Sequence, residues 1–383
     1  MARSTASPRP ELATVPPVER SAPVLRKART QDSRRHNRAL ITQLLYQHPE
    51  LTRSELARAS GLTPPTVSAL VAELETEGLV TDLGARVDGR VGKPATVVQL
   101  AQDGKHIVCA DLSHPSGVAG AVLDLRGNVV HRAARDLAGC TGQAAIDVLI
   151  DLLDELTRST DRPLLGLGVG SPGVIDDNGH IRIAVHLDWY DLPLADILEE
   201  RFGVPAFVGN DVNLMALGVH HFRQSGHRNV MVMTLEPGVG IGLVVDGRLV
   251  VGEQFSAGEV GHVTVREGGA LCVCGRNGCL EAEIRDVRTT PDAEMTARLE
   301  RAGRALGTLM APVVSVLNLQ EVVLVGPSHL VDGPLREATA RTCAERTLQT
   351  VTSPMSVRSL SDDPDLTLLG GASLVLASEL GAL

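Results

Sequence analysis

The sequence predicts an α/β protein in which a small helical domain precedes a larger, duplicated α/β domain. Its 383 residues suffice for two or three domains. Residues 1–100 carry 14 basic and 10 acidic side chains, which leaves 22 of the 36 basic and 36 of the 46 acidic side chains for residues 101–383. Near residue 105, helical periodicity gives way to alternating strands and helices. The basic end therefore suggests a nucleic-acid module joined to a domain with a different task.

Composition and cysteine usage exclude several protein classes. No uncharged stretch reaches the roughly 20 residues that a membrane helix needs. The Arg- and Pro-rich N-terminus has no apolar core of the kind found in secretory signals. We therefore expect a cytoplasmic protein without a membrane partner. Six cysteines in a chain of this length do not form a disulfide scaffold, and the crowding of three of them from Cys272 to Cys279 favours metal binding.

Residues 1–30 are expected to form a disordered basic arm. They contain five prolines, six basic residues and almost no apolar periodicity. A solubilising tail without further function is the alternative.

Residues 31–100 are expected to form a winged helix-turn-helix DNA-binding domain. An apolar stripe from Leu40 to Leu45 predicts a first helix. Thr52-Arg-Ser-Glu55 is a capping box that opens a second helix, ending at Gly61. Thr63-Pro64-Pro65 opens a third, which ends at Gly78. Alternating segments at 79–83 and 96–100 flank a Gly/Arg-rich loop at 84–94 and form the wing.

Two groups of residues are candidates for DNA contact. Thr63, Thr66 and Ser68 open the recognition helix and are small enough to approach base edges in a major groove. Arg90 and Lys93 lie in an extended, Gly-relieved loop that suits a minor groove. A helical bundle for protein contact, with a solvated basic loop, is the alternative.

Residues 101–383 are expected to fold as two similar rounds of strand, strand, strand, helix and strand, which predicts a duplicated α/β domain with a cleft between its lobes. The first round comprises strands 107–112, 117–123 and 129–133, helix 144–156 and strand 165–169. The second comprises strands 230–235, 241–245 and 249–251, helix 293–317 and strand 322–325.

One imidazole and three thiols form a candidate metal site within the second round. His262, Cys272, Cys274 and Cys279 are a closed tetrahedral set suited to Zn²⁺. A closed set leaves no open position for an activated water, so the expected zinc is structural. Buried or redox cysteines are the alternative.

The same segment carries a resemblance to a known family. Gly258-Glu-Val-Gly-His262, followed by Cys272-Val-Cys274-Gly-Arg-Asn-Gly-Cys279-Leu-Glu281, resembles the signature of the ROK family of repressors, open reading frames and sugar kinases. The resemblance covers nearly all of residues 105–380. It implies a duplicated actin-like (ribonuclease H-like ATPase-type) sugar-kinase fold, in which residues 101–383 form a two-lobed sugar-binding domain with a structural zinc site.

The resemblance also implies a sugar pocket. The residues that hold sugar hydroxyls in the family correspond to Asn210, Asp211, Glu259, His262 and Glu281. Asp211 occupies the position of the kinase base. On the nucleotide side three phosphate-binding turns depart from the family pattern; they read Asp111-Leu-Ser-His-Pro115, Gly238-Val239-Gly240 and Gly326-Pro327-Ser328. We therefore expect no catalytic residue and no ATP cofactor.

These features favour a sugar-responsive, DNA-binding transcriptional regulator, a repressor of carbohydrate metabolism genes. Its expected partners are a palindromic operator, a sugar or sugar phosphate effector, and further copies of itself in a dimer or tetramer. An ATP-dependent hexose kinase with a DNA-binding head is one alternative. A regulator that binds DNA but no sugar is another.

Overall fold

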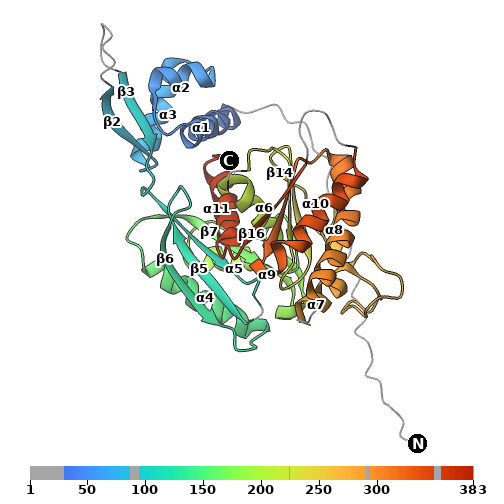
Figure 1. The fold of residues 1–383 in the computed structure, drawn as a ribbon. Helices are drawn as coiled ribbons and strands as arrows, with labels where there is room; N and C mark the ends of the chain where they lie inside the picture. The colour runs from blue at the N-terminus through green and yellow to red at the C-terminus, as the bar shows by residue number, and fades with distance from the viewer. Residues whose placement is uncertain are drawn as a thin grey trace, which may run out of the picture.

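The N-terminal head packs on a two-lobed α/β domain (Figure 1). A computed structural model describes residues 30–86, 95–114, 116–223, 225–289, 294–348 and 355–382. The head consists of α1 (Thr30–Gln47), β1 (Leu51–Thr52), α2 (Arg53–Ser60), α3 (Pro64–Thr76), β2 (Val80–Arg86) and β3 (Ala95–Leu100). Its three strands form an antiparallel sheet in the order β1-β3-β2, in which β1 was not foreseen from the sequence.

The predicted helix starts in the head are confirmed. The backbone N–H of Glu55 donates to Thr52 Oγ1 (3.2 Å), and the N–H of Thr52 donates to Glu55 Oε2 (2.7 Å). Gly61 ends α2 in the left-handed conformation (φ 69°). The Thr63 hydroxyl caps α3. Gly78 ends α3 as predicted: it follows the C-cap Glu77 in the left-handed conformation (φ 74°), and the N–H of Leu79 donates back to the carbonyl of Leu74.

The first lobe is built on a five-stranded sheet of order β11-β7-β4-β5-β6. Strands β11, β7 and β4 are parallel, whereas β5 and β6 are antiparallel additions. A separate three-stranded sheet has the order β10-β9-β8. The lobe comprises β4 (His106–Asp111), β5 (Gly117–Leu123), β6 (Val129–Asp136), α4 (Gly142–Arg158), β7 (Leu164–Ser171), β8 (Val174–Ile175), β9 (Ile181–Ala184), η1 (Val185–Leu187), β10 (Trp189–Leu192), α5 (Leu194–Phe202) and β11 (Ala206–Asn210).

The second lobe repeats this topology, which confirms the predicted duplication. Its sheet has the order β14-β13-β12-β15-β16, in which β13 pairs antiparallel with both β12 and β14, whereas β15 and β16 run parallel to β12. The lobe and its connections comprise α6 (Asp211–Phe222), β12 (Val230–Thr234), β13 (Gly240–Val245), β14 (Arg248–Leu249), η2 (Val260–His262), α7 (Leu280–Thr289), α8 (Met295–Leu317), β15 (Glu321–Gly326), α9 (Ser328–Val331), α10 (Pro334–Arg346), β16 (Ser356–Ser361) and α11 (Leu366–Glu379). Among the described residues, no helix combines the length and apolar character needed to cross a membrane.

The head shares one apolar core with the first lobe and the C-terminal helix. Ile41 and Leu45 of α1 are fully buried in the same cluster as Leu376 of α11 and the following Leu380. The Thr42 hydroxyl donates to the carbonyl of Leu380. On the first lobe, the Arg126 guanidinium lies 4.8 Å from the centre of the Tyr46 ring and donates to the carbonyls of Tyr46 and Leu45. The head is therefore anchored to both elements by apolar burial and by hydrogen bonds.

Helix α11 lies beside α6 (Figure 1), and its backbone is in direct contact with the backbones of α6 and β7. A Cβ atom added at Gly370 would lie 1.9 Å from the carbonyl oxygen of Leu214 in α6. A Cβ atom added at Gly168 in β7 would lie 2.6 Å from the Gly371 carbonyl. Because backbone atoms cannot yield as flexible side chains do, α6, β7 and α11 are held in one fixed arrangement.

Gly370→Ala tests this arrangement. The added methyl group must displace α11 from α6, so we expect the free energy of unfolding to fall by about 1–3 kcal/mol or more. Gly226→Ala is the matched control, since Gly226 is exposed and a Cβ there meets nothing within 4 Å. Urea unfolding of both variants measures the difference; equal stabilities would contradict the close packing.

Candidate functional site

Asn210 sits where β11 of the first lobe meets α6. Its side-chain oxygen accepts a hydrogen bond from the N–H of Asn213 (3.0 Å) and so caps α6. Its Nδ2 donates to the carbonyl of Gly173 (3.0 Å). Both ends of the amide are therefore engaged, which fixes the orientation of the side chain at the edge of the cleft.

Glu259 reaches the same place on a loop that lies against β13. Gly258 has φ 108°, and a Cβ atom there would lie 2.1 Å from the carbonyl oxygen of Ile241. Only glycine fits both the conformation and the contact. The loop therefore presents Glu259 next to Asn210, and both line one small cavity together with Asn213 and Phe255.

This cavity is small. Its volume of about 30 Å³ corresponds to roughly one water molecule, so a sugar needs the loop or the lobes to open. Asn213 contributes a buried Oδ1 atom that has no hydrogen-bond partner within the described part of the chain. Sequence reasoning missed Asn213 as a site residue, although it stands three positions after Asn210, one helical turn along the same face.

Three carboxyl groups converge at this end of the cleft. Burial, together with the negative charges of Asp111 and Glu259, raises the pKa of Asp211 to about 7. Burial also raises the pKa of Asp111, against the hydrogen bonds that its carboxylate accepts from Ser113. The cluster therefore holds a proton near neutral pH, and a protonated carboxyl can donate to a hydroxyl as well as accept from one. Asp111 was not among the predicted site residues.

Glu281 and His262 do not line the small cavity. The Glu281 carboxylate lies against the turn before β13, 3.5 Å from the N–H of Val239. His262 directs its Nδ1 atom to the thiol cluster, 3.6 Å from Cys272 Sγ. Of the five expected sugar-binding positions, Asn210 and Glu259 line the cavity. Asp211 is buried close to Glu259 without lining the cavity. Glu281 and His262 lie on the other side of the turn before β13.

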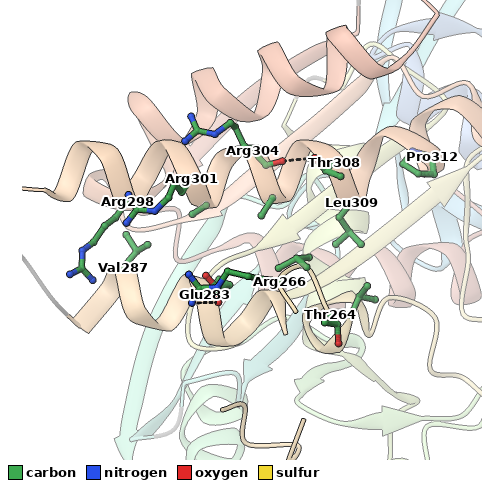
Figure 2. A pocket seen from close by; sticks show the side chains of 14 residues that line it. Thr264, Arg266, Glu283, Val287, Arg298, Arg301, Arg304, Thr308, Leu309 and Pro312 are labelled. Atoms are coloured by element: carbon green, nitrogen blue, oxygen red, sulfur yellow. Dashed lines mark hydrogen bonds and ion pairs between the residues drawn. The ribbon is translucent and has the colours of Figure 1, made fainter. Parts of the chain in front are cut away.

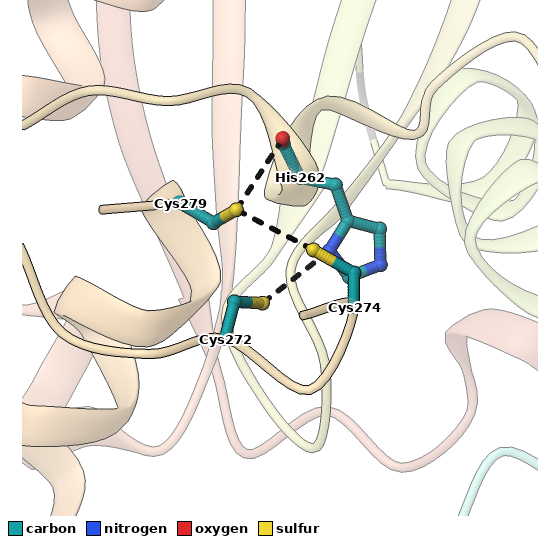
Figure 3. Close-up of side chains that lie close together, drawn as sticks. All are labelled: His262, Cys272, Cys274 and Cys279. Carbon is teal, nitrogen blue, oxygen red and sulfur yellow. Dashed lines mark hydrogen bonds between the residues drawn. The ribbon is translucent and has the colours of Figure 1, made fainter. Parts of the chain in front are cut away.

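His262, Cys272, Cys274 and Cys279 form one cluster that can hold a metal ion (Figure 3). One ligand atom from each lies within 4.8 Å of all the others, and the Sγ atoms of Cys274 and Cys279 are 3.6 Å apart. Tetrahedral bonds of about 2.3 Å to sulfur and 2.0 Å to nitrogen place two sulfurs about 3.8 Å apart and a sulfur and a nitrogen about 3.5 Å apart. The observed spacing fits such a centre.

Backbone hydrogen bonds within residues 262–279 bring the four candidate ligands together, and the pKa of one of the thiols is lowered. The N–H of Val265 donates to Gly278 O, and the N–H of Cys272 donates to Arg276 O (both 2.8 Å). A backbone hydrogen bond from Arg276 lowers the pKa of Cys274 to about 6. Burial and the neighbouring thiols raise the pKa of Cys279 to about 11. A bound cation offsets this repulsion, because metal ligation stabilises thiolates.

The exposed start of α3 carries the candidate DNA-contacting residues. Thr63 and Ser68 are exposed, whereas Thr66 is half-buried with its hydroxyl 2.8 Å from that of Thr63. The opposite face of α3 is buried in the head. Arg90 and Lys93 lie outside the described residues.

Asp211→Asn tests the raised pKa. The folded chain keeps the Asp211 proton up to about pH 7, whereas the unfolded chain loses it near the ordinary value of 3.8. Wild-type stability is therefore expected to fall as the pH rises from about 4 to 7, by at most about 4 kcal/mol. The asparagine variant should show a smaller decline, because Asp111 alone then contributes to it, and urea unfolding at pH 5 and pH 8 measures the difference. Asp177→Asn removes an exposed carboxyl and should follow the wild type; the same pH dependence in Asp211→Asn would refute the assignment.

Comparisons with known proteins agree with this architecture. A xylose repressor of Bacillus spizizenii is 27% identical over 75% of this chain and 81% of its own length. The N-acetylglucosamine repressor of Escherichia coli O157:H7 is 25% identical over 76% and 80%.

Solved structures show the same fold. A ROK family transcriptional regulator, described as a homologue of the Escherichia coli Mlc protein, superposes with a TM-score of 0.80 at 20% identity, covering 91% of this chain and 98% of the other. A ROK family glucokinase from Streptomyces griseus superposes with a TM-score of 0.59 at 22% identity and covers 70% of this chain and 98% of its own.

Two family models match separate parts of the chain. Residues 43–91 match the MarR family model, in agreement with the three helices and the wing of the head. Residues 116–287 match the ROK family model. This range includes most of the first lobe, the cleft residues and the loop that carries His262 and the three clustered cysteines. The head of the chain is therefore similar to the MarR family, and its larger domain is similar to the ROK family.

Proposed function

We propose that this protein is a sugar-responsive transcriptional repressor. Its head binds a palindromic operator, and a sugar or sugar phosphate binds in the cleft. One observation carries the proposal: α11 contacts both α1 of the head and α6, which begins at the cleft residue Asp211. The aligned relatives with repressor names support the same function. Their two different sugars leave the effector of this chain open.

The response follows from the small cleft cavity and the rigid packing of α11. A sugar enters only when the small cavity opens, so the sugar-bound chain must differ from the described conformation in the placement of its lobes or loop. Helix α6 cannot move far without α11, and α11 holds the head through Leu376 and Leu380. Sugar binding is thereby coupled to the position of the head. In a dimer or tetramer, two heads must match the spacing of the operator half-sites, so a change in their separation weakens DNA binding.

A hexose kinase with a DNA-binding head is the second candidate. The raised pKa of Asp211 favours it, since a base that titrates near pH 7 suits proton removal from a hydroxyl. The expected phosphate-binding turns argue against a kinase. The N–H of Ser113 donates to the Asp111 carboxylate and is therefore not available to a phosphate. Pro327, at the start of α9, has no N–H to donate to a phosphate. An ADP-release assay with a panel of hexoses separates the candidates, because steady turnover identifies a kinase.

Glu259→Gln tests the proposed function. The variant keeps the size of the side chain but loses the negative charge that strengthens hydrogen bonds accepted from sugar hydroxyl groups. We therefore expect the sugar affinity to fall by about tenfold or more. DNA affinity without sugar should stay as in the wild type, since Glu259 lines the cleft cavity, to which the head contributes no lining residue. Fluorescence anisotropy on an operator fragment enriched from genomic DNA, with and without each sugar, measures both.

Glu267→Gln is the matched control, because Glu267 is an exposed carboxylate of the same loop region outside the cavity. Its sugar response should equal that of the wild type. An unchanged sugar response in Glu259→Gln, or a wild-type chain that ignores every duplex fragment, would overturn the proposal.

We further propose that the metal cluster holds a structural Zn²⁺. Three thiolates and one imidazole form a closed set whose spacing suits this ion, and such an ion contributes directly to stability. Bound zinc would tie the start of α7 to the loop that carries Glu259. Its role is to hold these two segments together rather than to take part in chemistry.

Cys274→Ser is expected to lose the zinc and to lower the melting temperature. Cys140→Ser is the matched control, since Cys140 is a half-buried thiol outside the cluster. Metal content by mass spectrometry and thermal unfolding provide the measurements. Full zinc content in Cys274→Ser would show that the ligand assignment is wrong.

A further inference from the structure

The cleft cavity is too small for the sugar that it is proposed to bind. Its volume of about 30 Å³ holds roughly one water molecule, whereas small-molecule sites measure roughly 300–1,000 Å³. A larger cavity of about 520 Å³ lies between α7 and α8 (Figure 2). Its described lining residues include none of the five expected sugar-binding positions and none that also line the small cavity. Room for a sugar must therefore arise at the small cavity itself.

Most walls of the small cavity are held in place by the backbone. A Cβ atom added at Gly242 in β13 would lie 2.4 Å from the carbonyl oxygen of Val212 in α6. A Cβ atom at Gly258 would lie 2.1 Å from the carbonyl oxygen of Ile241, and the N–H of Ile241 donates to Gly258 O (3.0 Å). Asn210 is fixed by hydrogen bonds at both ends of its amide. Because such contacts resist separation, the wall that remains free to move is the loop before Gly258.

That loop places Phe255 in a strained conformation. Phe255 has φ 58°, in the left-handed region that a bulky side chain rarely adopts. Its side chain is nevertheless buried (6% exposed) and lines the small cavity together with Glu259. A strained residue persists only where its surroundings impose the conformation, and such residues concentrate in ligand-binding and switching segments. The strain therefore marks Phe255 as a residue with a role in the cavity.

The loop that carries Phe255 is closed at its base. The N–H of Ala257 donates to the carbonyl of Val251 (3.1 Å), and Gly252 turns the chain with φ 74°. Residues 252–256 can therefore change conformation while the base of the loop keeps its contacts. Phe255 is the only buried residue of this segment, so one aromatic ring is all that has to leave the interior.

We propose that Phe255 is the gate of the sugar site. In the described conformation its ring occupies part of the place of the sugar, and sugar binding displaces the ring toward solvent. The displacement lets the backbone return to an ordinary conformation, which offsets part of the apolar burial that is lost. A phenyl ring is similar in size to the six-membered ring of a sugar, so its departure makes room of the right size.

This inference rests on the proposed function and adds the step by which the sugar enters. Once the ring has left, a sugar can reach Asn210 and the unpartnered Oδ1 atom of Asn213. Both residues stand at the start of α6, the helix that the proposed response moves. Glu259 keeps its place meanwhile, because Gly258 stays bonded to β13.

Phe255→Gly and Phe255→Asn test the gate through the rate of sugar binding. Both new residues accept the left-handed conformation and have no ring to displace. We expect the association rate constant to rise by about tenfold or more, because a conformational change before entry slows binding. D-xylose, D-glucose and N-acetyl-D-glucosamine are the probes, and their NMR line shapes on addition of the full chain give the rates.

Gln254→Gly is the matched control. Gln254 is the exposed neighbour of Phe255 in the same loop, so this variant adds the flexibility of a glycine but keeps the ring. It should bind the sugars at the rate of the wild type. An equal gain in Gln254→Gly would assign the effect to loop flexibility and would overturn the gate.

Phe255→Trp reports the displacement directly. The introduced indole should be buried without sugar and exposed to water with it, so its fluorescence emission should shift to longer wavelength on sugar binding. The wild type is the control, since its single tryptophan is the buried Trp189, whose emission should stay unchanged.

The outcomes separate the gate from the proposed function. Equal association rates in the wild type and both ring-free variants, or sugar binding to Phe255→Trp without a shift in emission, would overturn the gate and leave the sugar response standing. A sugar that binds Phe255→Gly but not the wild type would support the gate and contradict the proposed response of the wild type. No sugar binding by any of these chains would overturn both proposals.

Discussion

The backbone-to-backbone contact of α11 with α6 and β7 is the constraint on which the rest of the structure depends. Glycines at 168, 370 and 371 allow these elements to approach until main-chain atoms touch. Contacts of this kind have no soft side chain to absorb a displacement. Since α6 begins at the cleft and α11 ends against α1, one rigid unit connects the carboxyl cluster with the DNA-binding head.

The loop from Gly258 to Cys279 provides a comparable constraint on the other side of the cleft. Gly258 lies in close contact with the backbone of Ile241 in β13. The cluster of His262, Cys272, Cys274 and Cys279 lies between the far end of the loop and the start of α7. Glu259 is thereby held at the cavity that Asn210 also lines, three residues before His262 of the cluster. This loop lines two cavities: Gly258 and Glu259 line the small polar cavity, and residues 263–266 line a larger one.

Charge in the cleft is balanced by protonation rather than by pairing. The charges of Asp111 and Glu259 act on Asp211, and among the described residues none of these three carboxyl groups forms an ion pair with a lysine or arginine. Burial then favours a shared proton. A carboxyl cluster of this kind is chemically suited to hydroxyl groups, which donate to ionised oxygens and accept from protonated ones.

The sequence by itself determined the elements whose signals are local. The capping box at Thr52, the proline start of α3, the duplicated strand order and the spacing of the metal ligands all follow from neighbouring residues, and all recur in the structure. Asn210 and Glu259, two of the sugar-binding positions that the ROK resemblance implies, line the same cavity. Only the tertiary structure decided that Asn213 lines this cavity whereas Glu281 and His262 do not, that Asp111 lies close to Asp211, and that the head shares its core with α11. These facts depend on how segments distant in sequence pack, and periodicity along the chain carries no information about such contacts.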